Sequence, residues 1–446
     1  MFNKNNIKFF SFDGYEYNKE SGVVSFKYSF DDSIHFIEKL TFSGHKKKLS
    51  DKEAQVLSRT FDYLQIALGI SYYKAALPKK ILTRGMSLSQ EACSFFQKLY
   101  TVGLQEFSYT NNVSLEDRVN FITSKFTKQS PANLNLRKIS VIPMGGGKDS
   151  FVSQDILKSN NKPHILLHIG NHVALKVIDK DSTIIRVERE ISPNLRSLNS
   201  DGAYNGHIPI SSIYAFITLA CSVIYDFDTV IMSNERSANT GSQMPNGTMV
   251  NHQYSKSHEF ESDFIKLVGD EILTSYKYFS ILRPFSEISI AKMFSKNTNA
   301  HHKFISCNKA SKQGVNKQEW CMNCPKCRFV FLSLAPFLEK DKLLNIFKKN
   351  LLDQPDQLNG YLSLVGFKSP KPFECVGEVQ ESIVAFHLLC QRSDWRDNII
   401  VAAVNNKVLQ HTKNIEQLTK EVLSPDFSTN NIPAEFLKII KVQYEL

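Results

Sequence analysis

The sequence lacks a long uninterrupted apolar run, and it has no apolar segment near its start. The first six residues are mostly polar and cannot form the apolar core of a signal peptide. The most apolar stretch, 208–227, contains several hydroxyl residues and Asp226, and a β-branched run follows it at once. This pattern predicts a buried helix of an α/β domain rather than a membrane span. We therefore expect a cytoplasmic protein without membrane contact.

Acidic residues are fewer than basic ones, but the excess of basic residues is not concentrated in any segment. The 446 residues include 54 lysines and arginines and 44 aspartates and glutamates, a formal net charge of +10. Scattered lysines are typical of a solvated surface, so we expect no nucleic-acid partner. A zinc-containing nucleic-acid-binding protein is kept as an alternative, and the oligomeric state stays open.

Cysteine is also scarce, and its spacing does not indicate a disulfide framework. Of eight cysteines, three stand at three-residue intervals, Cys321, Cys324 and Cys327, and Cys307 lies fourteen residues upstream. Four thiolates at such spacing can surround one tetrahedral ion, which predicts a structural zinc site, with an iron–sulfur cluster as the alternative. The other four stand in mostly apolar contexts, where we expect core positions; they are Cys93, Cys221, Cys375 and Cys390.

A glycine-rich loop is the most informative motif that the sequence does contain. A β-branched run at 139–142 precedes it and a helical pattern at 151–157 follows, so backbone N–H groups and a helix N-terminus can face a phosphate. The loop is not a Walker A motif, because Ile142 and Asp149 replace its first glycine and its Ser/Thr. It fits the Ser-Gly-Gly-x-Asp-Ser pyrophosphate loop (PP-loop) of ATP pyrophosphatases. The residues are Gly145, Gly146, Gly147, Lys148, Asp149 and Ser150.

Strand and helix patterns alternate from residue 138 onward, which predicts an α/β fold. We expect a doubly wound parallel sheet of the PP-loop (HUP-like) type, with a mixed α+β N-terminal domain and a helical C-terminal region. The expected parts are 1–110, 111–345 (the PP-loop ATP-binding domain with the four-cysteine site) and 346–446. The expected strands are 139–143, 164–169, 183–187 and 229–233, and the expected helices 51–75, 88–104, 150–159 and 211–226, with a further helix from Val173.

Titratable residues are concentrated at 233–261, after the strand at 229–233. Loops at the carboxyl edge of a parallel sheet commonly carry functional groups, and histidines there suit proton transfer near neutral pH. The residues of this kind are Glu235, Arg236, His252, Lys256, His258 and Glu259.

The loop at 145–150, the Asn-Glu-Arg-Ser-Ala turn at 234–238, the run at 251–261 and the cysteine segment at 320–331 together resemble one family. It is the UDP-N-acetylmuramoyl-L-alanyl-L-glutamate epimerases, which serve bacterial peptidoglycan precursor synthesis. The resemblance implies ATP-dependent epimerisation of the terminal L-glutamate of UDP-MurNAc-L-Ala-L-Glu through an acyl-adenylate, releasing AMP and diphosphate. A 7-cyano-7-deazaguanine synthase-like enzyme that adenylates another carboxylate is the second alternative.

With this reaction in view, we assign roles to these residues as a hypothesis. The loop would hold ATP phosphates and Mg²⁺, with Arg236 as a further anion-binding group. His252, His258, Glu259, Glu235 and Lys256 are the candidate catalytic residues, without a ranking between them. The four clustered cysteines would hold a structural Zn²⁺.

Overall fold

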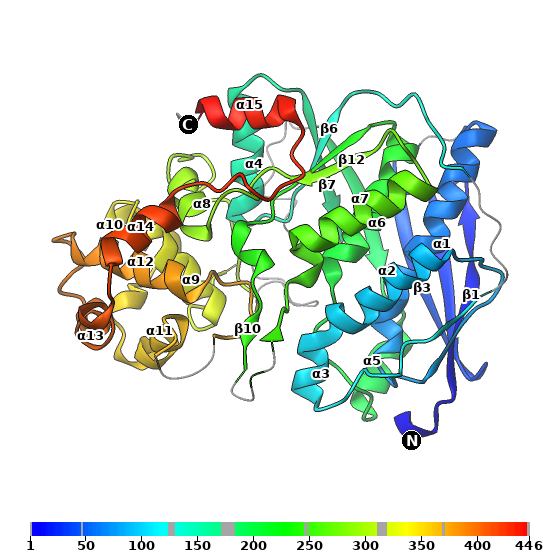
Figure 1. Ribbon diagram of the computed structural model, residues 1–446, viewed down its shortest axis with the longest axis horizontal. Coiled ribbons are helices and arrows are strands. Elements are labelled where there is room, and N and C mark those ends of the chain that lie inside the picture. The colour runs from blue at the N-terminus through cyan, green and yellow to red at the C-terminus, as the bar shows by residue number, and fades with distance from the viewer. Residues whose placement is uncertain are drawn as a thin grey trace.

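A computed structural model describes residues 2–443 except 46–47, 124–129, 171–182, 245–246, 248, 310–318 and 368–370. Among the described residues, ten strands form one sheet, with helices on both faces and a helical region at the C-terminal end (Figure 1). The strands are β1 Phe9–Asn18, β2 Val23–Phe30, β3 Ile34–Ser43, β4 Lys80–Thr83, β5 Phe121–Ile122, β6 Ser140–Pro143, β7 His164–Ile169, β8 Ile184–Glu190, β9 Thr229–Met232 and β12 Lys277–Ser280; β10 Ser242–Gln243 and β11 Met249–Val250 form a separate small pair.

The described residues form eight α-helices around the sheet and seven in the C-terminal part. Those around the sheet are α1 Asp51–Tyr73, α2 Gln90–Thr101, α3 Gln105–Asn111, α4 Lys148–Ser159, α5 Pro193–Ser200, α6 Ile210–Tyr225, α7 His258–Glu271 and α8 Glu287–Phe294. Those of the C-terminal part are α9 Pro325–Leu334, α10 Lys340–Phe347, α11 Leu358–Leu364, α12 Val379–Cys390, α13 Ile399–Lys407, α14 Ile415–Leu423 and α15 Ala434–Gln443.

Five neighbouring strands form one parallel block of the sheet, in the order β8-β7-β6-β9-β12. In chain order these are the third, second, first, fourth and fifth strands, which is the doubly wound arrangement. The chain reverses direction across the sheet between β6 and β9. Ligands of open α/β sheets bind beyond the carboxyl ends of the strands at such a switch point. The glycine loop leaves β6 at this point.

The two faces of the parallel strands are buried by different helices. Alternate residues point to opposite faces: Val141 belongs to one apolar core together with α6 and α7, whereas Ile142 belongs to the other with α4, α8 and α9. The fold is therefore a mixed α/β fold with a large parallel-rich sheet and a helical C-terminal region, as expected. The finer assignment to the PP-loop type stays a prediction.

The N-terminal strands extend the same sheet. β3 pairs antiparallel with β8, and the order continues as β3-β2-β1-β4-β5. Aromatic side chains of these strands pack on α1, as in the contact between Phe26 and Phe61. β1, β2 and β3 are antiparallel to one another, and the sheet runs unbroken from them into the parallel strands. The boundaries proposed at 110 and 345 stay predictions.

The apolar stretch that ends near residue 227 is a buried helix, as expected. α6 ends at Tyr225, and Asp226 adopts a left-handed conformation with φ 62° before β9 begins. Within the described ranges, no helix is both long and apolar enough to cross a membrane. The helix expected from Val173 lies outside the described residues.

Candidate active site

The glycine loop joins the carboxyl end of β6 to the first turn of α4. Gly146 has φ +83°, a conformation that favours glycine, and its carbonyl accepts a hydrogen bond from the N–H of Ile305. Gly147 is the N-cap of α4 and provides no side-chain cap. The first-turn N–H groups of α4 are thus left for an anion, with the positive end of the helix dipole behind them.

Lys148 does not extend into solvent but lies in a buried cluster of charges. Its side chain is 1% exposed, and its ammonium forms ion pairs with Asp149 and with Glu287, the first residue of α8. Lys326 of α9 approaches the same Glu287 carboxylate at 3.7 Å. The backbone N–H of Glu287 donates to Glu381 of α12 at 2.7 Å. Four helices, α4, α8, α9 and α12, therefore contribute charged groups to one place.

The electrostatics of this cluster keep its central pair ionised. Burial lowers the pKa of Lys148, but Asp149 and Glu287 raise it, and the net pKa lies above the ordinary lysine value. Burial raises the pKa of Glu287, but Lys148 and Lys326 outweigh this effect and hold it below the ordinary value. Glu381 differs, because burial and the charge of Glu287 raise its pKa to about 8. Glu381 is therefore a protonated carboxyl group near neutral pH.

The polar run at 251–256 meets the segment before α12. The Nε2 atom of His252 lies 2.9 Å from the carbonyl oxygen of Glu374. The ammonium of Lys256 lies 3.3 Å from the Sγ atom of Cys375 and 3.2 Å from Gln253 Oε1. Lys326 also donates to the carbonyl of Cys375. Cys375 is half-buried at this contact, so the expectation that it is an apolar core residue is wrong.

His252 is a neutral imidazole with one defined tautomer. Burial lowers its pKa to about 3, with further lowering by Lys371, His207 and Lys256. A carbonyl oxygen can only accept, so Nε2 carries the hydrogen and Nδ1 the lone pair. The expectation that His252 titrates near neutral pH does not hold. The hydrogen bond of its ring goes to the backbone carbonyl of Glu374.

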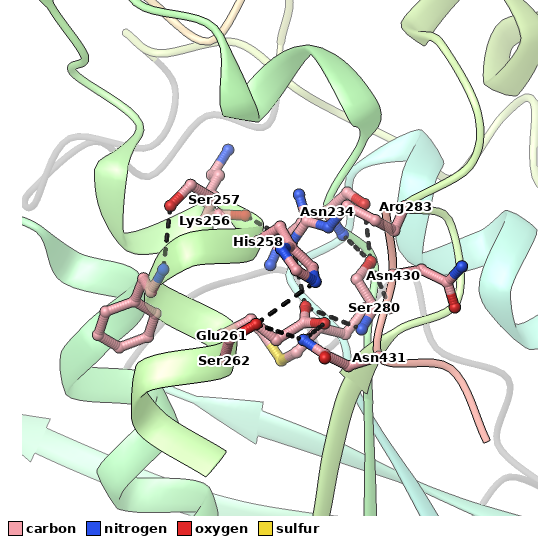
Figure 2. A network of polar contacts seen from close by, with 12 residues as sticks. Asn234, Lys256, Ser257, His258, Glu261, Ser262, Ser280, Arg283, Asn430 and Asn431 are labelled. Carbon is pink, nitrogen blue, oxygen red and sulfur yellow. Dashed lines mark hydrogen bonds and ion pairs between the residues drawn. The ribbon is translucent and has the colours of Figure 1, made fainter. Parts of the chain in front are cut away.

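A buried arginine holds the loops around this site. Arg283 is 1% exposed, donates to the carbonyls of Glu235 and Lys256 at 3.0 and 2.7 Å, and pairs with Glu261 at 3.0 Å. Figure 2 shows Arg283 with Lys256 and Glu261, and Asn431 of the C-terminal segment beside Glu261. The loops that carry residues 235 and 256 are thereby fixed to α7.

The other predicted residues have different surroundings. The guanidinium of Arg236 donates to three backbone carbonyls at the end of α14, those of Glu421, Val422 and Ser424. Glu259 is largely exposed and pairs with Lys98 at 2.6 Å, and the ring of His258 lies 3.4 Å from Ser262. No contact within the described ranges joins these three side chains to the Lys148 cluster. Their assignment as site residues stays a prediction.

The four clustered cysteines come together as expected. The Sγ atoms of Cys307, Cys321, Cys324 and Cys327 all lie within 4.8 Å of one another. Cys324 is the N-cap of α9, and its sulfur accepts from the N–H of Cys327 at 3.4 Å. The cluster thus lies at the start of the helix that also carries Lys326 into the charged site.

Sequence reasoning missed several charged residues of the site, among them Arg283, Glu287, Glu381 and Lys326. For Arg283 and Glu287, the position beside an apolar segment is a signal of a buried charge. Arg283 directly follows the mostly apolar segment 278–282, and Glu287 comes four residues later, so each charge stands beside residues expected in a core, where it needs a partner. Lys326 stands between Cys324 and Cys327, and no local pattern in the sequence marks it as a buried charge.

The chain is similar to known proteins over most of its length. Residues 1–281 match the family model described as the MurL N-terminal domain, and residues 303–419 match the MurL C-terminal domain. A relative from Xanthomonas oryzae pv. oryzae is 35% identical over 407 residues, 90% of each chain. A relative from a Micromonospora species is 35% identical over 442 residues, 97% of each chain. Both are named UDP-N-acetyl-alpha-D-muramoyl-L-alanyl-L-glutamate epimerase, as is a relative from Salinispora tropica.

Proposed function

The chain belongs to the UDP-N-acetyl-alpha-D-muramoyl-L-alanyl-L-glutamate epimerase family and is therefore an isomerase, and from that premise we propose its substrate and its reaction. The substrate is UDP-MurNAc-L-Ala-L-Glu, whose terminal L-glutamate becomes D-glutamate during peptidoglycan precursor synthesis. The reaction consumes ATP, passes through an acyl-adenylate, and releases AMP and diphosphate.

Adenylation solves a chemical difficulty of this epimerisation. The Cα–H bond next to a free carboxylate is very weakly acidic, because the carbanion would form beside a negative charge. Adenylating the α-carboxylate removes that charge and gives an acyl group that delocalises the electron pair. A base then takes the Cα proton, an acid returns a proton to the opposite face, and hydrolysis frees the D-glutamate and AMP. Positioned acid–base groups typically contribute about 10²–10⁴-fold each.

The glycine loop is the observation that supports ATP as the second substrate. It lies at the switch point of a doubly wound sheet, its N-cap Gly147 leaves the first-turn N–H groups of α4 without a side-chain cap, and Asp149 stands next to them. Such a loop suits a diphosphate and the Mg²⁺ that accompanies it. This arrangement supports a PP-loop (HUP-like) domain. Lys148 is already paired with two carboxylates, so its role includes fixing the loop against α8.

The polar contacts favour some of the candidate proton-transfer groups over others. Lys256 and Glu235 lie close enough to Asp149 for their charges to interact. The charge of Glu235 raises the pKa of Asp149, and the charge of Asp149 raises the pKa of Lys256. His252 is neutral and donates to the backbone. His258 and Glu259 contact residues of α7 and α2. We therefore place the chemistry beside Lys256 and Glu235.

The cysteine cluster fits a structural zinc ion. Zinc–sulfur bonds of about 2.3 Å in a tetrahedron place sulfur atoms about 3.8 Å apart, and the Sγ atoms of Cys321 and Cys327 are 3.7 Å apart. A zinc ion held by four thiolates has no open position, so its contribution would be to fix α9 and Lys326. Free thiols suit a reducing compartment, which supports a cytoplasmic location.

Exchange of labelled diphosphate into ATP tests the proposal. In the presence of the dipeptide substrate and Mg²⁺, the wild-type protein is expected to catalyse the exchange, and Lys148→Met and Asp149→Asn are expected to lose it. Lys158→Met, on the exposed side of the same helix, is the matched control and should behave like the wild type. Normal exchange in both loop variants would contradict the assignment of the loop.

A further inference from the structure

The side chain of Glu374 binds both of the chain segments that supply the clustered cysteines. One oxygen of its half-buried carboxylate, Oε2, accepts two hydrogen bonds. The side-chain amide of Asn308, the residue after Cys307, donates the first at 2.8 Å. The backbone N–H of Lys326, which stands between the last two cysteines, donates the second at 3.2 Å. A single carboxylate oxygen thus joins the two segments.

The backbone of Glu374 and of the next residue binds the polar run at 251–256. The carbonyl oxygen of Glu374 accepts from Nε2 of His252 at 2.9 Å, and His252 is 6% exposed. The sulfur of Cys375 lies 3.3 Å from the ammonium of Lys256, and the carbonyl of Cys375 accepts from Lys326. Two residues of the run are therefore bound to two consecutive residues of the 374–375 segment.

Both hydrogen bonds of the Glu374 carboxylate depend on how the cysteine segments are placed. Each donor is the chain neighbour of a cysteine, Asn308 of Cys307 and Lys326 of Cys327, so a shift of either segment moves a donor away from Oε2. An ion held by four thiolates fixes the two segments relative to each other. Groups that hydrogen-bond around a metal site commonly change its affinity about 10–100-fold.

We propose that Glu374 is a positioning residue that links the four-cysteine site to the polar run at 251–256. Its carboxylate aligns the two cysteine segments, and its carbonyl fixes the ring of His252, so the run keeps its place only while the cysteine segments keep theirs. This inference rests on the zinc ion of the proposed function, and it is independent of the reaction that the chain catalyses.

The link gives the cysteine site an influence on residues that it does not contact. Lys256 lies beside Cys375, and we have placed the chemistry beside Lys256. Disturbing the cysteine segments should therefore loosen the run around Lys256, although no cysteine of the cluster takes part in the reaction. Arg283 holds the carbonyl of Lys256 from the other side at 2.7 Å, so we expect loosening rather than unfolding.

The rate of zinc release to a chromophoric chelator tests the carboxylate. Glu374→Ala is expected to release zinc about 10-fold faster than the wild type. Glu374→Gln should stay close to the wild type, because its amide oxygen can still accept both hydrogen bonds. Glu319→Ala, at an exposed carboxylate two positions before Cys321, is the matched control and should not change the rate.

Hydrogen–deuterium exchange of the zinc-loaded proteins tests the link to the polar run. The N–H groups of Tyr254, Lys256 and Ser257 donate to carbonyls within 251–257, so their exchange measures the opening of this run. Glu374→Ala is expected to speed their exchange about 3- to 10-fold. Glu374→Gln and Glu319→Ala should match the wild type.

Nitrogen-15 chemical shifts of the His252 ring give a spectroscopic signature in the same samples. The ring carries its hydrogen on Nε2 in the wild type, and Glu374→Ala is expected to populate the other tautomer as well. Faster zinc release in Glu374→Ala with wild-type exchange and a wild-type His252 tautomer would limit the carboxylate to the cysteine site and overturn the link. Wild-type zinc release would overturn the role of the carboxylate.

Zinc removal from the wild-type protein is a measurement that needs no variant. A chelator is added, and exchange at 251–257 is compared with exchange in α6, which is almost fully buried. We expect faster exchange at 251–257 and no change in α6. Unchanged exchange at 251–257 after zinc loss, or an equal rise in α6, would contradict the link. A wild-type protein purified without zinc would contradict the metal assignment and this proposal with it, whether or not the chain converts its substrate.

Discussion

Replacing Glu287 by glutamine removes one negative charge from the centre of the site and leaves the volume almost unchanged. Lys148 and Glu287 are 1% and 2% exposed, whereas the side chain of Asp149 is 24% exposed. Breaking a buried ion pair by removing one partner costs about 3–5 kcal/mol. Because Asp149 still accompanies Lys148 in the variant, we expect a loss of about 3 kcal/mol, at the lower end of that range.

Urea unfolding at pH 7.5 measures this loss, with Glu91→Gln on the exposed side of α2 as the control. Lys148→Met should also destabilise the protein, and the double variant should lose less than the sum of the two single losses by about 1 kcal/mol or more. Since the pKa of Glu287 is held below its ordinary value of 4.5, its contribution is present above that pH and is lost as the pH falls below it. A Glu287→Gln protein as stable as the wild type at pH 7.5 would refute the reasoning.

Three further predictions concern other parts of the structure. The pKa of Glu381 is raised to about 8 by burial and by Glu287. Between pH 4.5, the ordinary pKa of a glutamate, and pH 8, the folded protein therefore keeps a proton that the unfolded chain has released. The free energy of unfolding should therefore fall as pH rises from 5 to 8, and urea unfolding of Glu381→Gln should show a smaller fall. Cys324→Ser should lose one equivalent of zinc by elemental analysis and lower the Tm, whereas Cys93→Ser should do neither. Arg236→Ala removes three hydrogen bonds to carbonyls at the end of α14 and should cost about 1–2 kcal/mol in the same unfolding assay.

Local patterns in the sequence were sufficient for the elements and for the motifs whose residues are close together. The strand expected at 164–169 is β7 with the same bounds, and the helix expected at 211–226 is α6 shifted by one residue. The four cysteines meet because three of them stand in one short segment. In each of these cases a few neighbouring residues determine the structure.

Contacts between distant segments could not be predicted in this way. The pairing of β3 with β8 joins residues about 150 positions apart, and no local pattern records it. Glu381 and Cys375 enter the site from a part of the chain for which the sequence predicted only helices. Cys375 was expected in a core because its sequence context is mostly apolar, yet the segment passes beside Lys256, and that contact is set by the fold.

Epimerisation in deuterated water is the most direct test of the central claim, that this chain activates and inverts a carboxyl-terminal glutamate. The wild-type protein is incubated with ATP, Mg²⁺ and UDP-MurNAc-L-Ala-L-Glu, and the chirality of the glutamate, the deuterium at Cα and the AMP formed are measured. We predict D-glutamate carrying deuterium at Cα, together with AMP. Unchanged L-glutamate without deuterium, in a protein shown to be folded, would contradict the account.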